Sequence, residues 1–187
     1  MNDQFRAVVL VEGVSDQVAL ETIAERRGRD LAAEGIGVVP MGGARNIGRY
    51  LERYGPGGLG LELAGLCDDG EEGEVRRGLE RAGLGVGHGR AGLEAAGVYV
   101  CVADLEDELI RRLGATAMER IIATQGELRS FRTLQRQPAQ RDRSLEQQLH
   151  RFLGSGAGRK LRYARLLAAA LDPLAVPRPL DRVLARL

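Results

Sequence analysis

Four short apolar runs, rich in β-branched residues, alternate with segments of helical spacing along the first two thirds of the chain. The apolar runs have the length and composition of strands and cover residues 6–12, 35–41, 59–67 and 98–103. Apolar residues recur at helical spacing over residues 16–27, 44–54, 71–82, 105–113 and 115–126, and a glycine-rich loop is expected at 84–91. Strands and helices in alternation predict an α/β fold with a four-stranded, mainly parallel sheet flanked by helices.

The pattern changes after about residue 127. Residues 129–143 are polar and contain Pro138, so we expect a loop there that becomes ordered on a partner. Amphipathic helices are expected at about 144–153 and 158–171, with a short closing helix at 180–187. The sequence therefore predicts an α/β domain over residues 1–127 and an arginine-rich helical extension over residues 128–187 packed on it.

Three of the four predicted strands run directly into carboxylates, at Glu12, Asp68 and Asp104. The carboxyl ends of parallel strands share one edge of the sheet, where open α/β sheets bind ligands, so these acids are expected to converge. Candidate metal ligands are Glu12, Asp16, Asp68, Asp69, Glu71, Glu72, Asp104, Glu106 and Asp107. Helix caps and solvated helix faces are the simpler explanation for Glu72 and Asp107.

Converging carboxylates suggest a divalent cation, because uncompensated acids at one place repel each other. Oxygen ligands favour Mg²⁺ or Mn²⁺ over zinc, and the acids suffice for two ions, as in phosphoryl-transfer sites. Cys67 and Cys101 lie in apolar runs, whereas His88 and His150 lie in unrelated segments. A metal site built from histidine and cysteine is therefore not expected.

The net charge of +1 hides an uneven distribution of charge. Residues 62–80 hold seven acids and two bases, whereas residues 129–165 hold ten bases and two acids. An acidic pocket beside a basic flank suits a metal-dependent enzyme that acts on a polyanion, and solvated helix faces explain the same counts equally well. Aromatic residues make up only 4% of the chain, so base stacking is not expected to dominate binding.

Targeting signals are not evident in the sequence. Residues 1–4 lack the basic and apolar regions of a signal peptide, and no apolar run is long enough to span a bilayer. We therefore expect a cytoplasmic protein that does not contact a membrane.

Three motifs resemble those of a known family. Residues 8–16 (VVLVEGVSD) resemble the first motif of the TOPRIM domain, which topoisomerases, primases and OLD-family (overcoming lysogenization defect) nucleases share. Residues 66–72 (LCDDGEE) stand where that family has its Asp-x-Asp motif, and residues 102–109 (VADLEDEL) resemble the acidic segment of OLD-type members. The turn at 41–47 (MGGARNI) and the helix that carries Lys160 also resemble OLD-type sequences. The chain is similar to small stand-alone actinobacterial TOPRIM proteins described as nucleotidyl transferase/hydrolase domains.

This resemblance implies a Rossmann-like TOPRIM catalytic domain that cleaves phosphodiester bonds in nucleic acid, more often DNA than RNA, with two Mg²⁺ or Mn²⁺ ions. It implies Glu12 as a metal ligand or general acid/base, Asp16 and Asp68 as metal ligands, and Asp104 and Glu106 as ligands of the second metal. One departure concerns Gly70, which occupies the position of the second aspartate in the strict Asp-x-Asp motif. Asp69 or Glu71 must substitute for it, or one metal is held weakly.

Lys160 is the only lysine among 27 basic residues. A cation beside two metals stabilises the charge that develops on a scissile phosphate, so a catalytic role is one reading, and a surface lysine on an arginine-rich helix is the equal alternative. Residues 154–161 (GSGAGRKL) fail the P-loop pattern and no strand precedes them, so ATP binding is not expected there. The sequence leaves open whether an ATPase acts in trans as a partner.

Arginines of the extension are expected to contact nucleic-acid phosphates, in salt-sensitive and sequence-independent binding. These are Arg129, Arg132, Arg136, Arg141, Arg143 and Arg159. Two alternatives stay open: a catalytically weak TOPRIM module that binds nucleic acid or a partner, which Gly70 favours, and a nucleotidyl transferase. The sequence does not specify the oligomeric state.

Overall fold

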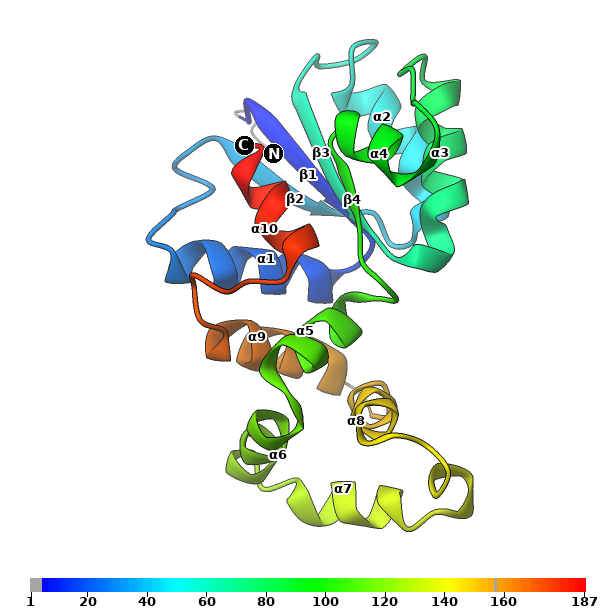
Figure 1. Cartoon of the computed structure of the whole chain (residues 1–187). Helices are drawn as coiled ribbons and strands as arrows, with labels where there is room; N and C mark the ends of the chain where they lie inside the picture. Colours follow the sequence, from blue (N-terminus) through cyan, green and yellow to red (C-terminus); the bar gives the residue numbers. More distant parts are fainter. Residues whose placement is uncertain (1–4, 157) are drawn as a thin grey trace.

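A computed structural model of the chain describes residues 5–156 and 158–187 and contains one four-stranded sheet (Figure 1). The strands are β1 (Ala7–Val11), β2 (Ile36–Pro40), β3 (Glu62–Cys67) and β4 (Val98–Val100). They lie in the order β2-β1-β3-β4, and every neighbouring pair is parallel, with Ala7 of β1 opposite Ile36 and Glu62. The predicted α/β class and four-stranded parallel sheet are thus confirmed.

Helices cover both faces of the sheet, and the sheet separates two hydrophobic cores (Figure 1). On one face lie α2 (Ile47–Tyr54), α3 (Glu72–Arg81) and α4 (Gly89–Ala95), and on the other lie α1 (Val14–Arg26) and α10 (Arg178–Ala185). Strand β1 is buried along its whole length because alternate side chains enter each core, Val8 on one side and Val9 on the other. Short 3₁₀ turns precede α2 at Ala44–Asn46 and α3 at Asp69–Glu71.

A helical lobe lies below the sheet in Figure 1. Its helices are α5 (Leu105–Leu113), α6 (Ala115–Thr124), α7 (Leu128–Gln135), α8 (Leu145–Leu153) and α9 (Arg159–Ala170). Phe152 packs edge-on against Phe131 and Tyr163, with ring centroids 5.2 and 6.3 Å apart. Helix α9 packs along α1, so the lobe and this face of the sheet share one continuous apolar core. The boundary between residues 127 and 128 stays a prediction.

One of two predicted loops is wrong, and the other is confirmed as far as His88, beyond which α4 begins. Residues 129–143 contain most of α7 and a 3₁₀ turn at Pro138–Gln140, because Phe131 and Leu134 bury one narrow face of an otherwise polar segment. The glycine-rich stretch at 84–91 leads into α4, where a Cβ at Gly92 would lie 1.9 Å from the carbonyl oxygen of Gly87. Glycine at 92 is thus required by close packing rather than by flexibility.

Membrane-spanning helices were not expected from the sequence. Within the described residues, every helix is too short or too polar to cross a bilayer.

Candidate metal centre

The carboxyl ends of β1, β3 and β4 bring acidic side chains to one edge of the sheet. Glu12 follows β1 directly, Asp68 follows β3 directly, and Asp104 lies four residues beyond β4. The backbone N–H of Asp69 donates to the carbonyl oxygen of Ala103 at 3.1 Å, which joins the loops that leave β3 and β4. Strands β1, β3 and β4 are consecutive neighbours in the sheet, so the three acidic loops that follow them are close together.

Glu12 and Asp16 lie at the junction of β1 and α1. Asp16 is 8% exposed, and its Oδ2 accepts a hydrogen bond of 2.7 Å from the backbone N–H of Gly13. Burial raises the pKa of Asp16 in spite of this hydrogen bond. Burial also raises the pKa of Glu12, and the carboxylates of Asp16 and Glu71 raise it further. Oε2 of Glu12 is buried and has no hydrogen-bond partner within the described part of the chain.

Asp68 has the most perturbed carboxyl group of the cluster. Burial raises its pKa to about 7, and the neighbouring carboxylates of Glu12, Asp16 and Asp104 add to the shift. Burial, together with repulsion between the acids, thus keeps a proton on Asp68 near neutral pH. This is the behaviour expected of a site that binds a cation.

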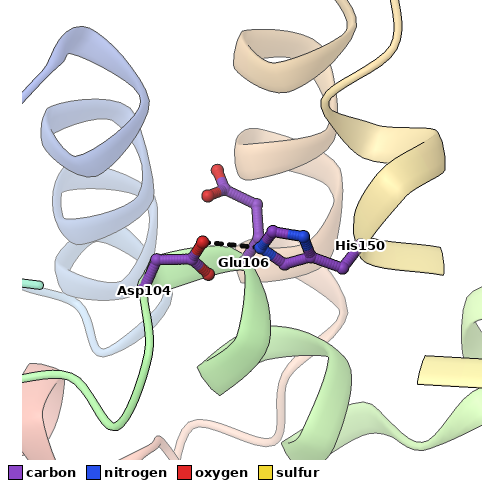
Figure 2. Close-up of side chains that lie close together, drawn as sticks. All are labelled: Asp104, Glu106 and His150. Atoms are coloured by element: carbon purple, nitrogen blue, oxygen red, sulfur yellow. Dashed lines mark hydrogen bonds and ion pairs between the residues drawn. The ribbon is translucent and has the colours of Figure 1, made fainter. Parts of the chain in front are cut away.

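Asp104 is held from two directions, by the backbone of Asp107 and by His150, and Figure 2 shows the second contact. Its Oδ1 accepts from the backbone N–H of Asp107 at 2.8 Å and caps α5, while Oδ2 lies 2.5 Å from Nε2 of His150 on α8. Burial acts to raise the pKa of Asp104, but these two contacts outweigh it and the pKa is lowered. The same contact with Asp104 raises the pKa of His150. The sequence gives no sign of His150 as a site residue, because no motif connects it with Asp104.

Glu106 and Lys160 complete the cluster. Glu106 is 6% exposed in the first turn of α5, and its Oε2 lies 3.1 Å from Nζ of Lys160 on α9. Burial raises the pKa of Glu106, and its Oε1 is buried without a hydrogen-bond partner. Asp104, Glu106 and His150 each offer one ligand atom, and these three atoms lie within 4.8 Å of one another (Figure 2).

These side chains fit a divalent cation. Buried polar atoms almost always have a partner, and of the three that lack one among the described residues, two are carboxylate oxygens of Glu12 and Glu106. Carboxylate oxygens are the ligands that Mg²⁺ and Mn²⁺ prefer, and a cation would also relieve the repulsion that raises the pKa of Asp68.

Gly70 leaves the second position of the Asp-x-Asp motif without a carboxylate, and its two neighbours lie in different surroundings. Asp69 is exposed and pairs with Arg90. The carboxylate of Glu71 lies close enough to Glu12 to raise the pKa of Glu12. Glu71 is therefore better placed than Asp69 to take part in the centre.

The remaining two acids of the candidate set pair with arginines. Glu72 lies 3.3 Å from both Arg76 and Arg90, and Asp107 lies 3.4 Å from Arg111. These contacts agree with the simpler explanation of Glu72 and Asp107 as helix-surface acids.

The predicted nucleic-acid contacts divide into two groups. Arg132 pairs with Glu119 at 2.7 Å and Arg159 pairs with Glu127 at 2.9 Å, so internal contacts engage both guanidinium groups. Four others are exposed on the lobe, and within the described residues none of them pairs with a carboxylate: Arg129, Arg136, Arg141 and Arg143.

Comparisons with known proteins agree with this geometry. Residues 5–69 match the family model for the TOPRIM domain of overcoming lysogenization defect protein-like proteins. The chain is similar to the C-terminal region of the Burkholderia pseudomallei OLD protein, with a TM-score of 0.75, 20% identity, and 97% and 96% of the two chains covered. It is also similar to the C-terminal region of the Xanthomonas campestris pv. campestris OLD protein phased with iodine, with a TM-score of 0.73, 25% identity, and 98% and 94% covered. No curated protein matches the sequence.

The family match covers the first acidic motif and reaches Asp69 of the second, and the structural similarity extends through β4, α5 and the helical lobe. The resemblance drawn from the sequence motifs is thereby confirmed. Residues 5–69 match the OLD-like TOPRIM domain, and the chain has the fold of the C-terminal region of OLD proteins.

Proposed function

We propose that the chain is a metal-dependent enzyme that hydrolyses phosphodiester bonds in nucleic acid, with DNA as the expected substrate. One observation carries the proposal: acidic side chains converge at the carboxyl edge of the parallel sheet, and a single lysine reaches them from α9. The converging acids are Glu12, Asp16, Asp68, Asp104 and Glu106. The match to the OLD-type TOPRIM domain supports the same conclusion.

The ligands fall into two groups that suit two ions. Glu12, Asp16 and Asp68 would hold one ion, with Glu71 in place of the missing second aspartate, and Asp104 and Glu106 would hold the other. His150 supports Asp104 through the 2.5 Å contact between the two side chains. When bound, divalent ions lower the pKa of water and neutralise charge on the scissile phosphate.

Two side chains would move or stabilise charge directly. The pKa of Glu12 is raised by burial, so its carboxyl group is suited to exchange protons nearer to neutral pH as a general acid or base. Burial acts to lower the pKa of Lys160, but Glu106 outweighs burial and the pKa is raised. Lys160 therefore stays an ammonium group at neutral pH and would stabilise the negative charge on the phosphate.

The exposed arginines of the lobe support a polymeric substrate. Arg129 and Arg136 lie in and just beyond α7, and Arg141 and Arg143 follow in the next turn. Guanidinium groups spread over such a surface suit the repeating phosphates of a nucleic-acid backbone rather than one nucleotide.

The proposal is tested with labelled duplex DNA and the corresponding RNA, each incubated with the chain and Mg²⁺ or Mn²⁺. We expect cleavage of DNA that stops when EDTA removes the metal. Glu12→Gln should slow cleavage by about 100-fold, the order lost when a catalytic acid or base is removed. Glu94→Gln is the matched control, because Glu94 pairs with Arg178 and is not one of the converging acids. Cleavage that survives EDTA, or an unchanged rate for Glu12→Gln, would contradict the proposal.

A second candidate is a module that binds nucleic acid or a partner without cleaving it. The pairing of Asp69 with Arg90 beside Gly70 favours it, because this removes one acid from the ligand set. DNA binding without cleavage, together with no Mn²⁺ binding at millimolar concentration, would identify such a module. An ATPase partner in trans stays a prediction.

A further inference from the structure

We infer that Glu127 is a positioning residue that fixes the first turn of α9 and thereby directs Lys160 at the acidic cluster. The inference rests on the proposed function for what Lys160 does there. The position of Lys160 is inferred from contacts within the lobe, and these contacts do not depend on whether the chain has enzymatic activity.

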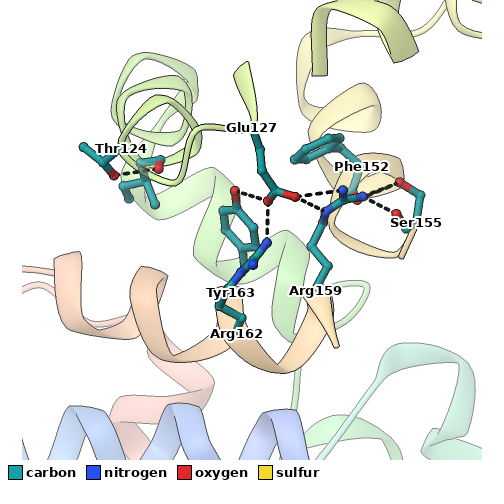
Figure 3. Close-up of polar contacts among 8 residues, drawn as sticks. Thr124, Glu127, Phe152, Ser155, Arg159, Arg162 and Tyr163 are labelled. Atoms are coloured by element: carbon teal, nitrogen blue, oxygen red, sulfur yellow. Dashed lines mark hydrogen bonds and ion pairs between the residues drawn. The ribbon is translucent and has the colours of Figure 1, made fainter. Parts of the chain in front are cut away.

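Glu127 accepts hydrogen bonds from three residues at the beginning of α9 (Figure 3). Its carboxylate lies 2.9 Å from Nη2 of Arg159, 2.5 Å from Nη2 of Arg162 and 2.8 Å from the hydroxyl group of Tyr163. Residues spaced by three and four positions lie on the same face of a helix. One partly buried acid on the link between α6 and α7 therefore holds one face of α9.

Lys160 lies within this anchored turn. Successive residues of a helix differ in direction by about 100°, so fixing the face of Arg159 and Tyr163 also fixes the direction of Lys160. In that direction its Nζ lies 3.1 Å from Oε2 of Glu106. The contacts of Glu127 on one side of α9 thus determine what Lys160 meets on another.

The start of α9 needs such an anchor. Residues 154–158 read GSGAG, and Gly158 caps the helix at φ 71° without a side-chain hydrogen bond to the first turn. Glycine-rich segments have wide conformational freedom, and uncapped first turns leave backbone N–H groups unpaired. Gly158 provides no side-chain cap, so side-chain contacts such as those of Glu127 fix the rotation of the first turn.

Arg159 extends the anchor to α8. Its guanidinium group lies 4.2 Å from the centroid of the Phe152 ring, donates to the carbonyl oxygen of Phe152 at 3.2 Å and contacts Ser155. Helix α8 also carries His150, the partner of Asp104. The pair of Glu127 and Arg159 therefore joins the two helices that deliver side chains from the lobe to the acidic cluster.

The sole lysine provides a direct test by NMR, because ¹³Cε-lysine labelling gives one side-chain resonance that reports on Lys160. We expect this resonance to differ from that of the urea-unfolded chain in the wild type. Glu127→Ala should move it at least halfway toward the unfolded value, and Glu127→Gln should move it less. Methyl resonances of the core serve as the check on folding, and Glu94→Ala is the matched control for loss of a Glu–Arg pair. An unchanged lysine resonance in folded Glu127→Ala would overturn the inference.

Kinetics provide the second test. Glu127→Ala should lower kcat by roughly tenfold at unchanged KM, and the double variant with Lys160→Ala should be no slower than Lys160→Ala alone, because both act through one ammonium group. Losses that multiply in the double variant would overturn the inference. If the chain cleaves no nucleic acid under any condition, the proposed function fails while the lysine resonance still decides the role of Glu127.

Discussion

The ammonium nitrogen of Lys160 lies 3.1 Å from Oε2 of Glu106 and joins α9 to α5 at the edge of the acidic cluster. The two side chains differ in exposure, with 7% of Glu106 and 53% of Lys160 accessible to solvent. The buried carboxylate of Glu106 is therefore placed to bind a metal ion inside the cluster, while the ammonium group of Lys160 is accessible to a ligand from solvent. A phosphate that entered between them would find positive charge already in place.

Lys160→Met should separate catalysis from metal binding. Loss of the ammonium group removes the charge that would stabilise the phosphate, and we expect kcat to fall about 100-fold. Mn²⁺ binding should not weaken, because a positive charge beside the carboxylates is lost. Cleavage rates and calorimetric Mn²⁺ titrations measure the two effects. Lys160→Arg, which keeps the charge, is the control, and a loss of Mn²⁺ affinity in Lys160→Met would contradict this role.

Metal binding should release protons near neutral pH. The pKa of Asp68 is raised to about 7, so about half of the molecules carry a proton on Asp68 at pH 7, and a cation must displace it. We expect release of about half a proton per chain at pH 7 and much less at pH 8.5. Calorimetry of Mn²⁺ binding in buffers with different ionisation enthalpies measures this number. Asp68→Asn should abolish the difference between the two pH values, and equal release at both in the wild type would argue against the raised pKa.

Gly70→Asp should restore the strict Asp-x-Asp motif. A Cβ added at Gly70 would meet no heavy atom within 4 Å, so the new side chain fits the fold as it stands. We expect Mn²⁺ to bind roughly tenfold more tightly, because an additional carboxylate ligand raises the affinity of an oxygen site. Gly57→Asp changes the charge equally at another position with open space and is the control. Equal affinities for Gly70→Asp and Gly57→Asp would show that position 70 does not face the ion.

The stability contributed by Glu127 should depend on pH. Burial acts to raise its pKa, but the hydrogen bonds from Arg159 and Tyr163 outweigh burial, so the pKa lies below the ordinary value of 4.5. A lowered pKa means that the stabilisation is complete well above pH 4.5 and is lost as the pH falls through the value in the folded state. We expect wild type to exceed Glu127→Gln by about 2 kcal/mol at pH 7. Urea unfolding at pH 7 and below pH 4 measures the difference, which should be smaller at the lower pH.

Much of the sheet and its acidic edge follow from local sequence patterns. The strands that carry Val9, Val38 and Ala64 are short apolar runs, and the parallel topology that follows from alternating helices brings Glu12 and Asp68 together. The convergence of these acids depends only on the order of the elements along the chain. Helix α7 could not be predicted in this way, because its buried face consists of little more than Phe131 and Leu134.

Contacts between distant helices explain what the sequence could not show. His150 meets Asp104, and Glu127 meets Arg159, only because α7, α8 and α9 pack together beside α5. No fixed spacing or motif accompanies such pairs. The sequence likewise left Asp69 and Glu71 equivalent beside Gly70, and the position of Arg90 on α4 distinguishes them.

Metal binding by the converging carboxylates is tested most directly by a crystal structure of the chain. The crystals would be soaked in 10 mM Mn²⁺ at pH 7.5, and anomalous scattering would be measured for manganese. We expect anomalous peaks among the carboxylates of Glu12, Asp68, Asp104 and Glu106. In crystals of Asp68→Asn, the peak nearest residue 68 should be lost. The absence of a peak among these acids, or peaks confined to Asp69 and Glu72 at the surface, would contradict metal binding by this cluster.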